Sequence, residues 1–493
     1  MHFLSKSKVM SGLQCPRRLW LEVKRPELMH FSDRVEQSFE FGHEVGAVAR
    51  QLFPGGVLID FEGELSSALA ETGHLLGRPG DMTLFEATFQ HGRVLVRADV
   101  LSRLGEGIHL IEVKASTALK PHYLNDIAIQ AWVIEGAGLP LKTIQLWHVD
   151  NAFVYPGGGD YRGLFARHDL TEEVLELMKQ VPAWAAGCQK ALSGGEPAIE
   201  VGKQCRDPHD CPFLDYCEPV EAEYPVSILP HGGALAGRLR IEGYKDLRDV
   251  PQDRLGTERH LRVWRVTRRG LAELDEGAAK ELAALAYPRY YMDFETVQFA
   301  VPVWPGTRPY EQLPFQWSCH IEDQNGRLEH REFLDTVGQA PMRRFAETLI
   351  EALGDKGPIL VYSNYERTVL NQLRKRFPDL EGSLVAIITR LVDLHPVAKD
   401  YYYHPAMMGS WSLKDVLPTI APELDYAGLG EVRDGGGAQN AYRDIISPRT
   451  DESRRQALIA DLRAYCYRDT LALVEIARFF EGRRHIGGYP HGS

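Results

Sequence analysis

The first third of the chain alternates between helix-like and strand-like patterns of apolar residues. Between residues 32 and 52, Phe41, Val45, Val48, Ala49 and Leu52 recur at the spacing of one helix face. From 81 to 114 the pattern changes to three short β-type runs, over 83–89, 94–101 and 108–113. Residues 122–137 return to helical spacing, and 143–149 have the composition of another strand. This succession predicts a mixed α/β core.

The pattern sharpens again from residue 288 onwards. A β-type run over 288–296 is followed by runs over 314–321 and 328–334, which predict an antiparallel meander. A helix over 342–353, an apolar strand over 358–363, a helix that begins at 364 and a long amphipathic helix over 458–480 come next. The sequence therefore predicts an N-terminal domain over 1–220, a helical linker over 221–285, a C-terminal domain over 286–486 and a flexible tail over 487–493.

Composition limits the class of protein but does not indicate a function. The 493 residues are enough for two or three domains, and the net charge of −12 argues against a surface that is basic throughout. Local basic grooves remain compatible with that charge. The N-terminus lacks the apolar core of a signal peptide, and no apolar run is long enough to span a bilayer. We expect a cytoplasmic protein without a membrane partner.

Two carboxylates and a lysine stand out in the first domain. Glu112 and Lys114 are two residues apart in a strand and so share one face, and hairpin pairing is expected to bring Asp99 beside Glu112. Such a set suits a divalent cation and a scissile phosphate. The simpler interpretation is a salt bridge on a solvated hairpin, which an isolated D…ExK pattern favours.

Three cysteines follow in a Pro- and Asp-rich loop, at C-x5-C-x5-C spacing. Cys205, Cys211 and Cys217 are poor core material and good thiolate ligands, and Cys15 beside Pro16 is the candidate for a fourth ligand. Structural zinc usually draws on more closely spaced pairs. The other three cysteines stand in apolar or mixed surroundings and are expected to be small buried residues.

Together, the four cysteines and the D…ExK hairpin resemble the RecB-type nucleases of the PD-(D/E)XK class that carry an iron–sulfur cluster. The resemblance implies a [4Fe–4S] cluster on the four thiols, metal ligation by Asp99 and Glu112, and Lys114 as the catalytic lysine. It also implies His43 as an upstream metal ligand and Gln130 as the helix glutamine of the family. The sequence departs from the family at Ile134, where a tyrosine is usual, and in the wide cysteine spacing. The arginines beside Cys15 are candidate substrate contacts: Arg17 and Arg18.

The second constellation is built from acidic residues on separate segments. Asp293 and Glu295 leave one face of the strand over 288–296, Glu366 opens a helix, and Tyr465 and Asp469 are i and i+4 on the last long helix. Asp393 competes with Glu366 for the middle position. Between these segments, aromatic residues interleave with Lys and His, and Trp411 and Lys414 are candidates for stacking bases and holding phosphates.

The order of these carboxylates resembles the three motifs of DnaQ-like 3′–5′ exonucleases on the RNase H-like fold. The resemblance implies two metal ions held by the four carboxylates, Mg²⁺ or Mn²⁺ as at the first site, and Tyr465 as the residue that orients the water, in the tyrosine variant of that family. A glutamate at 366 replaces the usual aspartate. Both halves, with Gly409-Ser-Trp-Ser-Leu-Lys-Asp-Val-Leu-Pro418, resemble a bacterial and archaeal family of unassigned function that fuses the two nuclease types.

Residues 241–251 also resemble the start of a helix–hairpin–helix-like element, but the match is short and we expect a plain helical linker instead. The expected function is a metal-dependent nuclease with two active sites that acts on DNA single strands or ends, with partners in repair or phage defence. Two alternatives stay open: an RNA-processing nuclease, and a nucleic-acid-binding scaffold in which one site is degenerate.

Overall fold

The computed structural model describes residues 3–31, 33–59, 65–218, 222–424 and 428–483. The chain forms two compact units. Unit 1 comprises Met1–Pro219 together with Phe299–Glu311, and unit 2 comprises Val220–Gln298 and Gln312–Ser493. The tail predicted over 487–493 lies outside the described residues. None of the helices that the structure describes combines the length and apolar character needed to cross a bilayer.

Unit 1 is built on a mixed sheet in which β3, β4 and β5 form an antiparallel meander. The strand order is β2-β3-β4-β5-β6-β7, and β1 pairs with β4 in parallel. β6 runs parallel to β5 because α5 (Pro121–Gly136) carries the chain back between them. The strands are β1 (Leu4–Ser5), β2 (Val57–Leu58), β3 (Met82–His91), β4 (Val94–Leu104), β5 (Gly107–Lys114), β6 (Leu141–Val149) and β7 (Phe165–Asp169).

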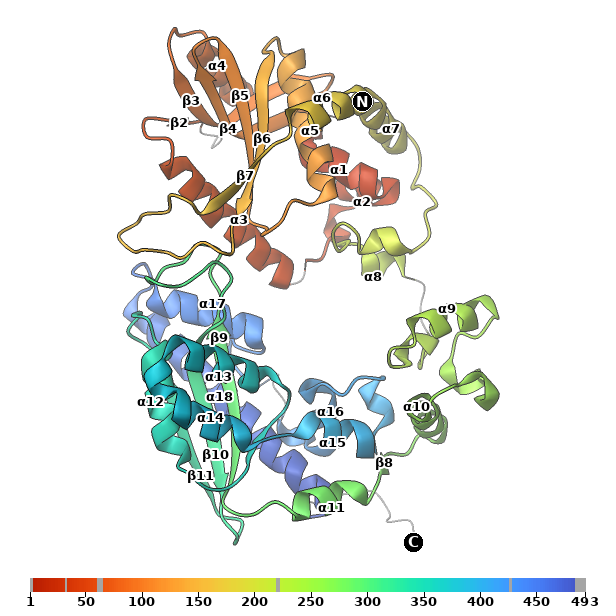
Figure 1. Ribbon diagram of the computed structural model, residues 1–493. Helices are drawn as coiled ribbons and strands as arrows, with labels where there is room; N and C mark the ends of the chain where they lie inside the picture. Colours follow the sequence, from red (N-terminus) through yellow and green to blue (C-terminus); the bar gives the residue numbers. More distant parts are fainter. Residues whose placement is uncertain (1–2, 32, 60–64, 219–221, 425–427, 484–493) are drawn as a thin grey trace. The chain divides into compact units, whose positions relative to one another are not determined.

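Alternate residues of this sheet face two separate apolar layers, so both of its faces are covered (Figure 1). Leu84, Leu101 and Leu110 pack with α5, while their neighbours Phe85, Val100 and Ile111 pack with α3 and with Ala300 and Val301 of unit 1's second segment. The helices are α1 (Lys6–Gln14), α2 (Pro16–Lys24), α3 (Asp33–Gln51), α4 (Leu65–Leu76), α5, α6 (Thr171–Leu177), α7 (Val181–Ser193) and α8 (Leu214–Cys217).

Unit 2 contains a five-stranded sheet of order β11-β10-β9-β12-β13. The first three strands are antiparallel, as the sequence predicted, and β12 and β13 continue the sheet in parallel with β9. The strands are β9 (Arg289–Val297), β10 (Leu313–Glu322), β11 (Leu328–Leu334), β12 (Ile359–Val361) and β13 (Leu391–Asp393), and β8 (Glu273–Leu274) pairs separately with β14 (Tyr402–Tyr403).

Helices cover both faces of this sheet. α18 (Glu452–Phe480) and α17 (Gly435–Ile446) contact β9, and α12 (Met342–Leu353) contacts β10 and β11. The remaining helices of unit 2 are α9 (Gly233–Ile241), α10 (Glu258–Arg269), α11 (Gly277–Ala283), α13 (Tyr365–Arg376), α14 (Glu381–Thr389), α15 (Leu394–Tyr401) and α16 (Leu413–Ile420). The segment predicted as a linker is part of this unit, because Leu247, Val263 and Leu282 lie in its apolar core.

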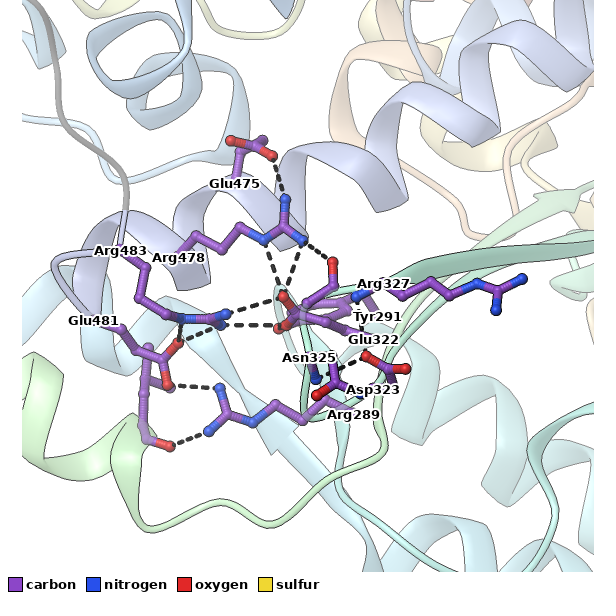
Figure 2. A network of polar contacts seen from close by, with 12 residues as sticks. Arg289, Tyr291, Glu322, Asp323, Asn325, Arg327, Glu475, Arg478, Glu481 and Arg483 are labelled. Atoms are coloured by element: carbon purple, nitrogen blue, oxygen red, sulfur yellow. Dashed lines mark hydrogen bonds and ion pairs between the residues drawn. The ribbon is translucent and has the colours of Figure 1, made fainter.

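A buried ion-pair network fixes the end of α18 to β9 and β10 (Figure 2). Glu322 is fully buried and accepts hydrogen bonds from Tyr291 Oη (2.9 Å) and Arg478 Nε (3.0 Å). Arg483 adds a contact of 3.1 Å to the same carboxylate. Burial alone would raise the pKa of Glu322, but the hydrogen bonds from the two arginines hold it below its usual value.

Candidate active sites

Strand β9 carries two carboxylates, Asp293 and Glu295, on the same face of the sheet. Side chains alternate along a strand, and Phe294 packs against Phe345 of α12, with ring centroids 4.9 Å apart. Asp293 and Glu295 therefore project from the opposite face, which α18 covers. The pairing of β9 with β10 is irregular between Pro314 and Gln316, next to Glu295. Such irregularities are common beside active sites because they redirect a side chain.

Two helices complete a pocket of about 420 Å³ over this face. Glu366 lies in the first turn of α13, and Tyr465 and Asp469 lie one turn apart on α18. All three line the pocket together with Asp293 and Glu295. The predicted residues of the second constellation thus converge from three elements on one cavity.

Acidic side chains outnumber basic side chains in the lining of this pocket. Burial, with repulsion from Asp469 and Glu295, raises the pKa of Asp293 well above its usual value, and burial with the charge of Asp469 does the same for Glu295. Burial raises the pKa of Glu366 to about 8. Among the described residues, Glu366 Oε2 has no hydrogen-bond partner. Oxygen ligands in such surroundings suit a divalent cation.

Cys466 also lies at this site, although the sequence predicted only a small buried residue. The residue is fully buried, and its Sγ lies 3.9 Å from Asp293 Oδ2. Potential ligand atoms of Asp293, Glu295 and Cys466 all lie within 4.8 Å of one another. Burial next to Asp293 raises the pKa of the thiol well above its usual value, so Cys466 enters the site as a neutral group.

The other candidates of this half have different positions. Lys414 is exposed, lines the pocket and acts electrostatically on Glu295. Trp411 is buried and lies outside the pocket lining, with its indole N–H donating to the Tyr402 carbonyl at 2.7 Å. Asp393 caps α15 by accepting a hydrogen bond from His395 N at 2.9 Å. Glu366, rather than Asp393, is thus the carboxylate in the pocket lining.

In unit 1 the hairpin brings Asp99 and Glu112 together as expected. β4 and β5 are antiparallel with Val100 opposite Ile111, and Asp99 Oδ2 accepts a hydrogen bond from Val113 N at 2.8 Å. Burial, with the charge of Glu112, raises the pKa of Asp99 to about 8. The two carboxylates are therefore electrostatically coupled across the strand pair.

Lysines and a glutamine fill the space around Glu112, which is 1% exposed. Lys114 Nζ lies 2.6 Å and Lys6 Nζ 3.0 Å from Glu112 Oε1, and Gln130 Nε2 donates to Oε2 at 2.6 Å. Both lysines also pair with Asp126. Although burial lowers the pKa of Lys6 and of Lys114, the Asp126 and Glu112 carboxylates raise both pKa values above the usual lysine range.

Three other sequence candidates of unit 1 do not join this group. His43 is exposed on α3, and no group of ligand atoms within 4.8 Å joins it to Asp99 and Glu112 in the described part of the chain. Arg17 pairs with Glu196 (2.6 Å), and Arg18 pairs with Glu22 (2.9 Å). These two arginines have acidic partners within unit 1.

The four predicted cysteine ligands come from the two ends of unit 1's first segment. Cys15 separates α1 from α2, and the other three lie in the loop that ends with α8. Gln14 joins the two regions by donating to the carbonyls of Gln204 and His209, each at 2.7 Å. Cys217 is close enough to the thiols of Cys211, Cys15 and Cys205 to interact with them electrostatically. None of the four forms a disulfide.

Sequence reasoning missed three residues of these sites. Lys6 lies far from Glu112 in the sequence and carries no motif, so only the fold places it there. Asp126 stands four residues before Gln130 on α5, a helical spacing that would have placed it on the same face. Cys466 follows directly after Tyr465, and its neighbour was the one available signal.

Comparison with known proteins gives limited matches. Residues 290–412 match a family described as a domain of unknown function, DUF2779. The matched segment includes Asp293, Glu295 and Glu366 and ends before Tyr465 and Asp469. None of the curated proteins compared with the chain matches it.

One solved structure, titled "Crystal structure of SSO0001", shares 15% identity with this chain. The similarity covers 43% of this chain and 84% of that one, with a TM-score of 0.22. At this TM-score we draw nothing from the match. The architecture described above rests on the chain's own strands and helices, which make both units mixed α/β structures.

Proposed function

We propose that this protein is a divalent-metal-dependent nuclease with two sites, which hydrolyses phosphodiester bonds of DNA at single strands or ends. The observation that carries the proposal is the convergence of Asp293, Glu295, Glu366 and Asp469 on one pocket, next to Tyr465. Strand order and the placement of acidic residues on β9 support an RNase H-like fold of the DnaQ type for unit 2. The meander β3-β4-β5 with its acidic pair supports a PD-(D/E)XK-like fold for unit 1.

The unit 2 pocket fits Mg²⁺ or Mn²⁺. Its carboxylates are hard oxygen ligands, and Glu366 Oε2 lacks a partner among the described residues. When bound, such cations offset the charge that develops on a phosphodiester and lower the pKa of water. We propose that Tyr465, one helical turn from Asp469, orients the attacking water and that Lys414, which is exposed and lines the pocket, holds a neighbouring phosphate. The resemblance of the motif order to DnaQ-like exonucleases leads us to propose that unit 2 removes nucleotides from a 3′ end.

The four thiols of unit 1 support a shared ligand site, because Cys217 is close enough to the thiols of Cys211, Cys15 and Cys205 to interact with them electrostatically. We propose that this site holds a [4Fe–4S] cluster, which would fasten the two ends of unit 1's first segment together. Visible absorbance and iron and zinc counts of anaerobically purified protein test this assignment.

A second function, binding without cleavage, has specific support in unit 1. Lys6 and Lys114 neutralise Glu112 and Asp126, and His43 is exposed. These ion pairs occupy the carboxylates that a divalent cation would need, and so they favour a unit 1 site that does not hold a catalytic cation. Unit 1 would then be the degenerate site of a nuclease whose activity resides in unit 2.

Two substitutions separate these functions. We expect Asp293→Asn to reduce Mn²⁺-dependent removal of nucleotides from 3′-labelled single strands at least about 100-fold, because even residues that only support metal ligands cost 10- to 100-fold. In the protein that already carries Asp293→Asn, the additional substitution Asp99→Asn should abolish the remaining cleavage if unit 1 is active. It should leave that cleavage unchanged if unit 1 only binds nucleic acid. The matched control is Glu329→Gln, an exposed carboxylate of β11 outside both sites.

Activity that survives both substitutions together would contradict the proposal. Equimolar DNA and RNA strands of one sequence, competing in a single reaction, decide between the DNA and RNA alternatives.

A further inference from the structure

Helix α10 presents a basic pocket that neither nuclease site uses. Its sequence, ERHLRVWRVTRR, holds five arginines in twelve residues. A pocket of about 490 Å³, the α10 pocket, is lined by Gln252, Leu261, Trp264, Arg265, Arg268 and Arg269. Within a chain of net charge −12, this is a local concentration of positive charge.

Acidic neighbours account for only part of this charge. Arg265 forms a two-pronged pair with Glu273, at 2.9 and 2.8 Å, and Arg262 reaches the same carboxylate at 3.2 Å. Arg268 and Arg269 are exposed and have no acidic partner among the described residues. Two guanidinium groups at the pocket are thus free to hold an anion.

The pocket also contains a fixed aromatic surface. Trp264 donates its indole N–H to the Val250 carbonyl at 2.8 Å, which sets the orientation of the ring. The guanidinium of Arg268 lies over that ring, 5.3 Å from its centroid. A guanidinium group and an indole ring held next to each other offer planar faces on which a nucleobase can stack.

The helix dipole explains only part of this arrangement. Basic residues in the last turn of a helix stabilise it through the helix dipole, and Arg268 and Arg269 occupy that turn. The dipole does not require a pocket, nor a tryptophan under one of the guanidinium groups. An acidic peptide would use the charges but would leave the stacking surface idle, so the aromatic ring favours an unpaired base.

We propose that the α10 pocket binds single-stranded nucleic acid, with phosphates held by Arg268 and Arg269 and one base stacked on the Arg268–Trp264 pair. The choice of a nucleic acid among polyanions rests on the proposed function. Single strands combine a phosphate backbone with accessible base faces, the two features that this pocket can recognise. The pocket would hold the substrate strand at a point separate from either cleavage site.

The test measures binding of the full-length protein to a fluorescently labelled oligothymidylate by anisotropy, in EDTA so that no cleavage occurs. We expect Arg268→Gln and Arg269→Gln together to raise Kd on the order of tenfold. They should also reduce the slope of log K against log salt by about 0.7 for each lost phosphate contact. Arg259→Gln, which removes one arginine charge from the same helix outside the pocket lining, is the control for each of the single variants Arg268→Gln and Arg269→Gln.

A second pair of measurements isolates base stacking from charge. Arg268→Lys keeps the charge and loses the planar group, so it should weaken binding of oligothymidylate but not of an abasic strand of equal length. Unchanged Kd and salt slope in the double variant, an effect of Arg259→Gln equal to that of each single variant, or stronger competition by an acidic peptide than by the strand would each overturn the inference. Because the assay contains no metal, its result is independent of whether the protein cleaves DNA.

Discussion

The carboxylate of Glu366 links the unit 2 pocket to the pH dependence of the fold. Burial raises its pKa from 4.5 to about 8, so below pH 8 the metal-free folded protein holds a proton that the unfolded chain releases near pH 4.5. Between these values the folded state binds more protons than the unfolded state. The stability that this group contributes is therefore present at low pH and is lost as pH rises towards 8.

We expect the melting temperature of the metal-free protein to fall between about pH 5 and pH 8, and Glu366→Gln to reduce that fall because its side chain does not titrate. Adding Mn²⁺ at pH 8 should raise the melting temperature of the wild type, because the cation replaces the proton. Buried His320, whose pKa burial lowers to about 4, contributes the opposite trend, so the difference between variant and wild type is the informative quantity. An equal pH dependence in the two proteins would contradict this explanation.

Individual site residues were predictable where the sequence kept them in order on regular elements. Asp293 and Glu295 share a strand face and Tyr465 and Asp469 a helix face, so their periodicity placed them correctly. Lys6 was not predictable, because its pairing with Glu112 spans 106 positions and depends on how α1 packs against the sheet. The same applies to His43, whose expected role came from resemblance and whose exposed position is set by the packing of α3.

At the scale of elements, α18 serves two purposes along its 29 residues. Its middle supplies Tyr465 and Asp469 to the pocket and Cys466 to the neighbourhood of Asp293, while its last turns carry Arg478 to Glu322 (Figure 2). The ion pairs at its end therefore hold the helix that positions the acidic residues. Anchoring of this kind limits sliding of the helix over β9.

We expect Glu322→Gln to destabilise unit 2 by about 2 kcal/mol, because removing one partner of a buried pair leaves charged arginines uncompensated; their partial exposure moderates the cost. Thermal or urea unfolding measures the change. Glu329→Gln is the matched control, since its ion pair with Arg331 is exposed to solvent and its loss should change stability by less than about 0.5 kcal/mol. Equal effects of the two substitutions would show that burial of Glu322 adds nothing.

Most elements near both sites could be predicted because their periodicity is strong and their ends are marked by Gly, Pro or Asp. β9, β10, β11 and α12 follow the predicted pattern closely, and the end of the last helix, Phe480, matches the prediction. The helices between 221 and 285 were predicted as a linker instead, because short helices with scattered apolar residues give no sign of the core that they enter.

For the whole molecule, the loop that joins β9 to β10 crosses between the units. Residues 299–311 follow the strand of Asp293 and Glu295, yet they pack in unit 1. Tyr155 N donates to the Thr307 carbonyl at 3.0 Å, Tyr161 Oη donates to the Pro302 carbonyl at 3.1 Å, and Tyr310 bonds the carbonyl of Ala115, next to Lys114. A loop sequence contains no local pattern that indicates packing in another unit. The sequence alone therefore did not predict that residues 299–311 belong to unit 1.

We expect a fragment of residues 1–219 to be less stable than the same fragment carrying residues 299–311 on a flexible linker. The short fragment exposes the apolar layer that Ala300 and Val301 cover beside Trp147 and Val45. Melting temperature and aggregation of the two fragments measure the difference. A fragment with scrambled residues 299–311 controls for the added length, and equal melting temperatures for all three would contradict a structural role for the segment.

The crossing loop also has a consequence for synthesis. During translation the N-terminus of the chain leaves the ribosome first, and domains usually fold as they emerge. Here the first unit stays unfinished until residue 311 has left the exit tunnel, by which time β9 of the second unit has also emerged. The apolar layer that Ala300 and Val301 cover therefore stays uncovered during the translation of about ninety further codons after Pro219.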